Sequence, residues 1–253
     1  MMTRMKGPVL YCGDPHGRFS HIIDAAERTD ASAVILLGDM EAEQLLEVEL
    51  AGIRDRVWWI PGNHDTDTES TWRNLWGSGA LAERNLHGRV IELPDGTRIA
   101  GLGGVFRAAV WMPSESGEPR VRSRAQLTKA TPRQDRCQGG PHRKHWSSIY
   151  PDEFDRLARL RADVLVTHEA PGYHPHGFKM LDTLAGALRV KVAVHGHHHD
   201  SLDSSACWVS QGFKSFGVGL RGITAIDGEG QAKVIVPGEP DFERGYRAGR
   251  IEC

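Results

Sequence analysis

The sequence has little cysteine, no long apolar run and no excess of charge of one sign. Its four cysteines, Cys12, Cys137, Cys207 and Cys253, are scattered without a CxxC pair. This spacing argues against a disulfide framework and predicts reduced thiols. No apolar run approaches the length of a membrane span, and the first residues, MMTRMK, do not have the apolar stretch of a signal peptide. We therefore expect a cytoplasmic protein with no membrane partner.

The charge balance gives no general attraction to polyanions, because the formal net charge is −2. Positive charge is concentrated in residues 107–145, which hold nine Lys and Arg against three Asp and Glu. The same residues lose helix or strand periodicity and are rich in Pro, Ser, Gly and Arg. A long irregular segment inside a compact domain is usually functional or disordered. We expect one domain over 1–253, with 107–145 as an irregular basic insertion that could form a lid.

Outside this insertion, short apolar runs alternate with amphipathic helical stretches, a pattern typical of α/β folds whose strands are covered on both faces. The expected strands are 8–14, 33–39, 57–65, a hairpin within 89–104, 162–168, 190–197, 207–213, 222–227 and 232–236. The expected helices are 19–28, 41–52, 151–160 and 178–188. The tail after Gly238 is polar and supports no assignment.

Polar side chains that bind metals follow five of the expected strands, in the stretches GDPHG, GD, GNHD, TH and GHHH. In an extended chain, residues two apart point the same way, so Asp14 and His16 could bind one ion, and His197 and His199 are spaced alike. Asp39 directly follows its strand, where its carboxylate could bridge two ions. Oxygen and imidazole ligands without thiolate suit Mn, Fe, Zn, Co or Ni rather than a structural zinc site. The candidate ligands are Asp14, His16, Asp39, Asn63, His168, His197 and His199.

The ordered pattern D-x-H, G-D, G-N-H-[DE], a single H and G-H-x-H spans residues 13–199 and resembles that of the calcineurin-like metallophosphoesterases. The resemblance implies an α/β fold, a two-layered mixed β-sandwich flanked by helices, with a centre of two divalent or trivalent metal ions at one rim. Of these ions, Mn is expected to support activity in vitro. The first ion would be held by Asp14, His16, Asp39 and His199. The second would be held by Asp39, Asn63, His168 and His197.

The resemblance also implies a reaction, the hydrolysis of phosphomonoesters or phosphodiesters by a hydroxide that the two metal ions activate. His64 would lie beside the metals without binding them, and would give a proton to the leaving group or stabilise its charge. Asp65, its neighbour, could hold the His64 imidazole in the donating orientation. We therefore expect a hydrolase acting on ester bonds.

The sequence differs from two subgroups of this family, and these differences narrow the range of expected substrates. The stretches GDMEAEQ and PGNHD lack the phosphate-binding arginines of protein serine/threonine phosphatases, and Ala42 stands where purple acid phosphatases have a tyrosine. The basic insertion could supply the missing cation through Arg107, Arg143 or Lys144. His174 and His176, in the loop after His168, are further candidates for substrate contact. The expected substrate is a phosphorylated small molecule or a nucleotide, and the oligomeric state stays open.

Two other functions remain open: a nuclease, and a non-catalytic protein-binding scaffold of the same fold. A nuclease needs a continuous basic groove, and the insertion is the one basic segment. A scaffold would be expected to lose ligands or His64, and none is lost. His195 and His198 are expected to be bystanders, with His198 facing outward.

Smaller features have plainer interpretations. Cys137 and the histidines of the stretch PHRKH lack a fourth partner for a structural zinc site. Trp58 and Trp59 are expected in the core, whereas Trp111 could either stack on a base or make a hydrophobic contact.

Overall fold

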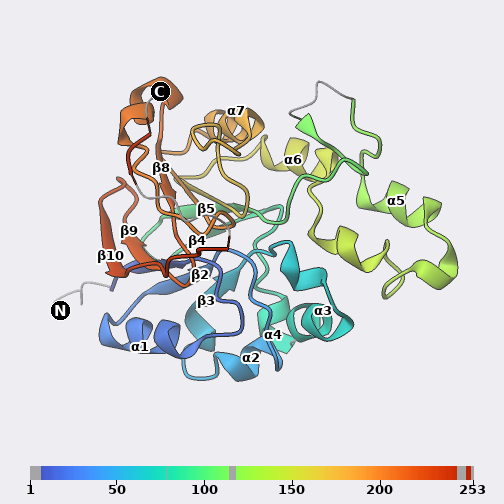
Figure 1. Cartoon of the computed structure of the whole chain (residues 1–253), viewed down its shortest axis with the longest axis horizontal. Coiled ribbons are helices and arrows are strands. Elements are labelled where there is room, and N and C mark those ends of the chain that lie inside the picture. Colours follow the sequence, from blue (N-terminus) through green and yellow to red (C-terminus); the bar gives the residue numbers. More distant parts are fainter. Residues whose placement is uncertain (1–6, 78, 114–117, 244–248, 252–253) are drawn as a thin grey trace.

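The computed structural model describes residues 7–77, 79–113, 118–243 and 249–251. Two five-stranded mixed sheets pack face to face, and helices cover the outer face of each (Figure 1). The predicted α/β fold, a two-layered mixed β-sandwich flanked by helices, is therefore confirmed. The stretch MMTRMK, residue Cys253 and part of the basic insertion lie outside the described residues.

The first sheet has the strand order β10-β9-β1-β2-β3, and the second has the order β4-β5-β6-β7-β8. The strands of the first sheet are β1 (Val9–Cys12), β2 (Ala33–Leu36), β3 (Val57–Trp59), β9 (Ile223–Ile226) and β10 (Ala232–Val236). Those of the second are β4 (Arg89–Glu92), β5 (Arg98–Leu102), β6 (Val164–Thr167), β7 (Val192–His195) and β8 (Lys214–Gly217). Strands β1 to β3 run parallel, as do β5 to β8. The loops that follow parallel strands therefore gather at one edge of each sheet.

Eight α-helices are described: α1 (Ser20–Arg28), α2 (Leu46–Glu49), α3 (Glu69–Trp76), α4 (Gly79–Ala82), α5 (Arg124–Ala130), α6 (Pro151–Leu157), α7 (Lys179–Leu188) and α8 (Trp208–Gln211). The described 3₁₀ helices are η1 (Arg54–Arg56), η2 (His64–Thr66), η4 (Arg133–Asp135), η5 (Arg143–Ser147) and η6 (Ser205–Cys207). In Figure 1, α1 to α4 lie below the sheets and α6 and α7 above them, while α5 projects to the right.

Strand β1 shows why the apolar runs are continuous. Leu10 and Cys12 face the layer of α1 and α2, whereas Val9 and Tyr11 face the second sheet. A strand buried on both faces needs apolar side chains at every position. The same alternation holds in the second sheet, where Leu165 packs toward α6 and α7 and its neighbours on β6 pack between the sheets.

Several expected elements differ from the structure. The helix expected over 41–52 is reduced to the four residues of α2, and α3 and α4 were not predicted. The strand expected over 207–213 is wrong, because this stretch ends η6 and forms α8, and the strand follows as β8. Gly212, with φ of 81°, ends α8, and the Trp208 indole donates to the Ser204 hydroxyl at 3.0 Å. This local turn overrides the strand propensity of Trp and Val.

The basic insertion is more structured than its composition predicts. It contains α5, whose first turn is capped by the Ser123 hydroxyl accepting from the backbone N–H of Gln126 at 3.0 Å. The Trp146 ring, just beyond the insertion, packs against Trp72 and Trp76 of α3 with centroid distances of 5.0 and 6.0 Å. The segment is thus attached to the body of the protein through an aromatic cluster.

Trp59 is fully buried, as expected, while Trp58 is half-buried under Arg84. Trp111 is buried against Phe106 and Phe154, so the expectation of a hydrophobic contact is confirmed. Trp111 is therefore not placed to stack on a base.

The cysteines and helices bear on the expected cellular context. Cys12 and Cys137 are free thiols, whereas Cys207 is disulfide-bonded, so the prediction of reduced thiols is wrong for Cys207. Among the described residues, no helix is long and apolar enough to cross a membrane.

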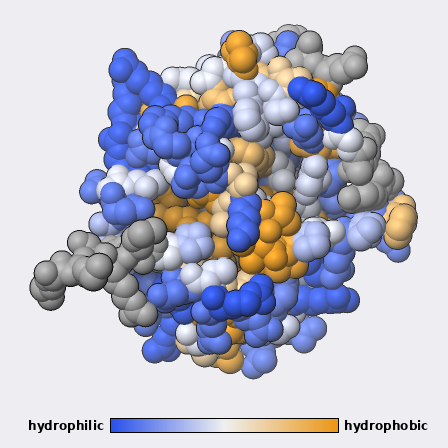
Figure 2. All heavy atoms as spheres, turned by 90° about the vertical axis from the view of Figure 1, so that its left-hand side faces the viewer, coloured by the Kyte–Doolittle hydropathy of each residue, from blue (hydrophilic) through white to orange (hydrophobic). Residues whose placement is uncertain are grey.

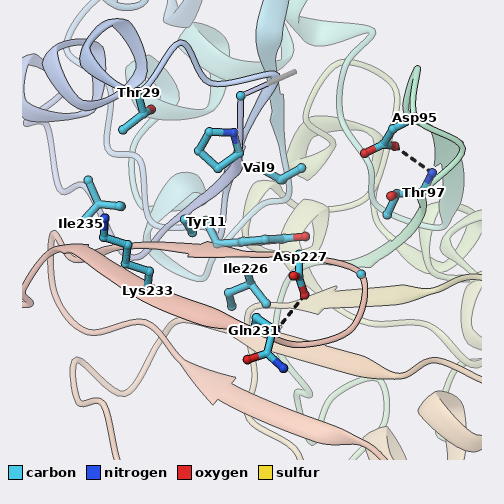
Figure 3. A pocket seen from close by; sticks show the side chains of 14 residues that line it. Val9, Tyr11, Thr29, Asp95, Thr97, Ile226, Asp227, Gln231, Lys233 and Ile235 are labelled. Atoms are coloured by element: carbon cyan, nitrogen blue, oxygen red, sulfur yellow. Dashed lines mark hydrogen bonds between the residues drawn. The ribbon is translucent and has the colours of Figure 1, made fainter. Parts of the chain in front are cut away.

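A cavity of about 560 Å³ opens at the start of β1, the end of the sandwich opposite to Asp14. It is lined by side chains that include Tyr11, Asp95, Asp227 and Lys233 (Figure 3), but by none of the candidate metal ligands. The candidate metal ligands therefore lie outside this cavity.

On the face at the left of Figure 1, apolar side chains gather in the middle with hydrophilic ones around them (Figure 2), and β10 exposes Val234.

Candidate metal centre

The loops after five strands meet at one rim of the sandwich and bring the candidate ligands together. One group of ligand atoms, from Asp14, His16, Asp39 and His199, lies within 4.8 Å of one another. The ligand atoms of a second group, from Asp39, His168 and His197, also lie within 4.8 Å of one another. The Asn63 carboxamide oxygen lies 3.2 Å from Nε2 of His168 and so joins the second group. These are the two sets that the family resemblance implies, and Asp39 is common to both.

The backbone that presents these side chains is left-handed rather than extended. The φ angles are 40° at Asp14, 42° at His16, 50° at Asp39, 73° at His197 and 58° at His199. The argument from alternation along an extended strand is therefore wrong, although the residues it selected do converge. A residue other than glycine in this region costs roughly 1–3 kcal/mol and persists where the surroundings enforce it, most often at functional sites.

Two imidazoles of the first group are held by carboxylates. Nδ1 of His16 lies 2.5 Å from Glu41 Oε2, and Nδ1 of His199 lies 2.5 Å from Asp241 Oδ2. A carboxylate accepts, so we assign the proton of each ring to Nδ1. The two Nε2 atoms lie 3.1 Å apart and present their lone pairs to a common point. This is the arrangement by which proteins orient histidines toward a metal ion.

His168, in the second group, is held by the backbone instead. Its Nδ1 donates to the Leu37 carbonyl at 2.7 Å, and its Nε2 lies 3.4 Å from Asp39 Oδ2. The ring is fully buried. Its tautomer is therefore also fixed with Nε2 facing the centre.

The carboxylates at the centre are fully buried, which gives a test of whether a cation fits. Both oxygens of Asp14 accept the backbone N–H of His197, at 3.0 and 2.9 Å, and Asp39 Oδ1 accepts that of His64 at 2.8 Å. Within the described part of the chain, Asp39 Oδ2 has no hydrogen-bond partner. Buried carboxylates are stable when they are paired with cations or bind metals. The donor set and the unsatisfied oxygen both fit metal ions.

The charged side chains at the centre shift one another's pKa. Burial raises the pKa of Asp14, and the like charge of Asp39 acts in the same direction. Burial would also raise the pKa of Asp39, but the imidazole of His168 outweighs it and holds this pKa below its ordinary value. An anionic Asp39 is the form that can bind metal.

His64 lies beside the first group, with its ring centroid 5.8 Å from that of His16. Its Nδ1 is 2.6 Å from Oδ2 of Asp67, which is three residues further along the chain. The expectation that Asp65 holds this imidazole is therefore wrong, and Asp67 takes that place.

Asp65 has a different structural role. Its fully buried carboxylate accepts the backbone N–H groups of Gly62 and Glu41, at 2.8 and 3.1 Å. Burial raises the pKa of Asp65 to about 7, and the charge of Asp39 adds to this rise. Adjacent side chains in η2 point in different directions, which is why His64 faces the rim while Asp65 faces inward and ties two site loops together.

Arg107, the predicted substrate-binding residue, lies in the loop that follows β5. Its side chain is half-buried, and its Nη2 donates to the Ser147 hydroxyl at 3.4 Å. Burial lowers the pKa of Arg107, and the carboxylates of Asp67, Glu169 and Asp39 oppose this effect. The guanidinium therefore interacts electrostatically with three acidic side chains near the rim.

The two loop histidines differ from each other. His174 is only 3% exposed, its Nε2 lies 3.2 Å from Asp200 Oδ2, and its ring stacks on that of His198 at 3.9 Å. The expected substrate contact is wrong for His174, which packs beneath the loop of His197 and His199. His176 is exposed and uses its backbone N–H to donate to His174 Nδ1 at 3.1 Å.

The remaining histidines of the stretch VHGHHH also lie inside the protein. His195 is buried, accepts from the Tyr173 hydroxyl at 2.6 Å and donates to the Gly196 carbonyl at 2.9 Å. Burial lowers the pKa of His195 to about 4, which favours the neutral ring. His198 is half-buried between His174 and His197, so the expectation that it faces outward is wrong.

Sequence reasoning missed four acidic residues at the site. Glu41 and Asp67 are close in sequence to motif residues and could have been found from that spacing. Glu169 follows His168, is buried and accepts the Phe106 backbone N–H at 3.2 Å, and burial raises its pKa to about 7. Asp241 lies in the polar tail, where no local signal marks it.

The fold and the rim together define a class: α/β proteins with two packed sheets and a cluster of imidazoles and carboxylates that could hold metal ions at one rim. The model of the family described as calcineurin-like phosphoesterase matches residues 7–201. The chain therefore belongs to the calcineurin-like phosphoesterase family, a family of phosphoester hydrolases.

The chain is also similar to individual proteins. An uncharacterized protein of Haemophilus influenzae is 37% identical over 220 residues, which is 87% of this chain and 94% of that protein. The crystal structure of TT1561 of Thermus thermophilus aligns with a TM-score of 0.59 and 14% identity, covering 92% of this chain and 99% of the other. At that identity the second comparison shows the shared fold.

Proposed function

We propose that this protein hydrolyses phosphate monoesters or diesters of small molecules or nucleotides with a pair of metal ions at the rim. The observation that carries the proposal is the convergence of two ligand groups that share Asp39. The proposed ligands of the pair are Asp14, His16, Asp39, Asn63, His168, His197 and His199. Their oxygen and imidazole donors suit Mn, Fe, Zn, Co or Ni.

Two such ions, when bound, supply Lewis acidity to a phosphoryl oxygen and lower the pKa of water. The protein holds the ligands ready for them. Asp39 is anionic and fully buried, and the rings of His16, His168 and His199 are fixed with Nε2 inward. Because the ligand geometry is set in advance, little reorganisation is needed during the reaction.

His64 is the proposed proton donor to the leaving group. Its Nδ1 is engaged by Asp67, so Nε2 is the nitrogen that exchanges the proton with a departing oxygen. The half-exposed position of His64 gives that nitrogen access to a substrate at the rim.

Arg107 is the proposed anchor for phosphate. In the described part of the chain its Nε has no hydrogen-bond partner, although the atom is buried. A guanidinium with an unused donor can donate to the phosphoryl oxygens of a substrate bound at the rim.

The nuclease alternative is weaker, because basic side chains of the insertion are used within the protein. Arg122 pairs with Asp155 at 3.1 Å, and Arg124 with Glu153 at 3.4 Å. Arg143 donates to the Thr66 carbonyl at 3.0 Å. A nucleic-acid groove needs free cations along the strand, so we favour a compact phosphate ester as substrate.

The test is hydrolysis by purified protein that is first stripped of metal and then given Mn²⁺. The substrates are p-nitrophenyl phosphate, bis-p-nitrophenyl phosphate and single-stranded DNA. We expect turnover of one of the two esters and a loss of about 10³-fold in Asp39→Ala, since this carboxylate serves both ions. Asp24→Ala, which changes an exposed carboxylate of α1, is the matched control. Absence of turnover, or full activity in Asp39→Ala, would contradict the proposal.

A further inference from the structure

The polar tail after β10 returns to the metal centre. The backbone N–H of Glu239 donates to the Leu220 carbonyl at 2.8 Å, and its carboxylate accepts from Arg221 Nη1 at 2.6 Å. Arg221 also donates through Nε to the carbonyl of Pro15, between two candidate ligands, at 3.3 Å. Gly238 permits this approach, because a Cβ there would lie 3.1 Å from Gly219 Cα. The tail is thus fixed beside the loop that bears Asp14 and His16.

From this position Asp241 reaches His199. Its Oδ2 accepts from His199 Nδ1 at 2.5 Å, and its Oδ1 accepts the backbone N–H of Glu243 at 3.1 Å. The imidazole is 5% exposed and the carboxylate side chain 15% exposed, so water screens the contact weakly. The other nitrogen of the ring, Nε2, faces His16 Nε2 at 3.1 Å.

We propose that Asp241 is a positioning residue for the first metal position, acting through His199. This inference rests on the proposed function, since it concerns the same pair of ions. Asp241 fixes the tautomer that leaves the Nε2 lone pair free and adds negative charge behind the ring, and both effects strengthen the bond from a histidine to a cation. The family model ends at residue 201, so this contribution lies outside the segment that defines the family.

The two metal positions should therefore differ in affinity. In the first, both His16 and His199 have a carboxylate at Nδ1, at 2.5 Å each. In the second, His168 has a backbone carbonyl there, and the Glu169 carboxylate lies 3.7 Å from His197 Nε2. The second position also has Asn63, a neutral ligand, where the first has Asp14. The first position therefore has two closely paired carboxylates and an additional anionic ligand, and should bind its ion more tightly.

The experiment is calorimetric titration of metal-free protein with Mn²⁺, together with metal content after desalting. We expect two binding events in the parent protein. In Asp241→Ala the tighter event weakens by about 10- to 100-fold and the weaker event is unchanged. Asp241→Asn, which keeps an acceptor oxygen but loses the charge, should give a smaller loss. Glu243→Gln removes a neighbouring tail carboxylate without touching His199 and should bind as the parent does.

A double-mutant cycle assigns the effect to His199. His199→Ala should weaken the same event, and adding Asp241→Ala to it should cause little further loss. Additive losses, or parent-like affinities in both Asp241 variants, would overturn the role of Asp241. If the parent protein bound no Mn²⁺, the proposed function itself would be contradicted. That result differs from normal Mn²⁺ binding in the Asp241 variants, which would contradict only the role of Asp241. Because Asp241→Asn is isosteric, it provides the measurement even if Asp241→Ala folds poorly.

Discussion

The proposed role of His64 as proton donor can be tested separately from metal binding. If it protonates the leaving group, its importance depends on how much that group needs a proton. We expect His64→Asn to lower kcat on phenyl phosphate by about 10²-fold or more, and to lower kcat on p-nitrophenyl phosphate less, because nitrophenolate can leave unprotonated.

Asp67→Asn should show the same dependence on the leaving group with a smaller loss, because the Nδ1 partner loses its charge but remains an acceptor. Metal content measured on each variant separates loss of the proton donor from loss of metal. Equal losses on both substrates would argue that His64 binds substrate or metal instead.

Residue-level prediction from the sequence worked where a motif residue adjoins a strand end. Asp14, Asp39 and His168 each follow an apolar run, and their order along the chain identified the site. Prediction failed for the carboxylates that pair with the site histidines, because tertiary packing determines these pairs. The pairing of His64 with Asp67 rather than Asp65 depends on the directions of side chains in η2, and that of His199 with Asp241 depends on the route of the tail.

At the scale of elements, Glu153 of α6 holds three parts of the chain together. Its Oε2 lies 2.8 Å from His87 Nε2, before β4, and its Oε1 lies 3.4 Å from Arg124 Nε of α5. Burial would raise the pKa of Glu153, but His87 and Arg124 outweigh it and lower this pKa from 4.5 to about 2. The basic insertion is therefore anchored by a buried ionic contact as well as by the Trp146 cluster.

This contact makes a pH-dependent contribution to stability. A carboxylate whose pKa is lower in the folded state stabilises the fold above pH 4.5, and that contribution is lost as the pH falls toward about 2. We expect Glu153→Gln to lower the free energy of unfolding by roughly 2 kcal/mol at pH 7, and the gap from the parent to shrink by pH 3. Urea denaturation of metal-free protein at both pH values measures it. The control is Asp155→Asn, which removes only the exposed ion pair between α6 and Arg122 and should change stability little. An equal gap at both pH values would contradict this account.

Element-level prediction succeeded for buried strands and failed for short helices. Strands such as β2 and β7 are buried at every position, and the sequence displays this directly as continuous apolar runs. The helix α8 is held by the Gly212 turn and the Trp208 indole contact, and α5 by one capping serine. Such contacts leave no periodic pattern, so the insertion was expected to be irregular.

At the scale of the whole molecule, the centre joins the two sheets. Asp14, Asp39 and Asn63 follow strands of the first sheet, whereas His168 and His197 follow strands of the second. Ions bound there, as proposed, would cross-link the sandwich, and any ligand that binds the folded state alone stabilises it.

We therefore expect Mn²⁺ to raise the melting temperature. At a free concentration 100 times Kd the gain is about 2.7 kcal/mol, which for a chain of this size is roughly 5–10 °C. Differential scanning calorimetry in EDTA and in Mn²⁺ measures the shift. Asp39→Ala should melt at one temperature in both buffers, and a parent protein insensitive to EDTA would argue against ions between the sheets.

The left-handed backbone at the rim has a consequence for how this protein could change. Glycine would suit Asp14, His16, Asp39, His197 and His199 better than the residues they have, because it carries no Cβ to oppose such φ angles. Glycine at these positions would relieve backbone strain in the metal-free protein, but it would also remove the side chains whose bound ions are expected to stabilise the fold. Such a variant should therefore lose its response to Mn²⁺ whatever it gains in the metal-free state.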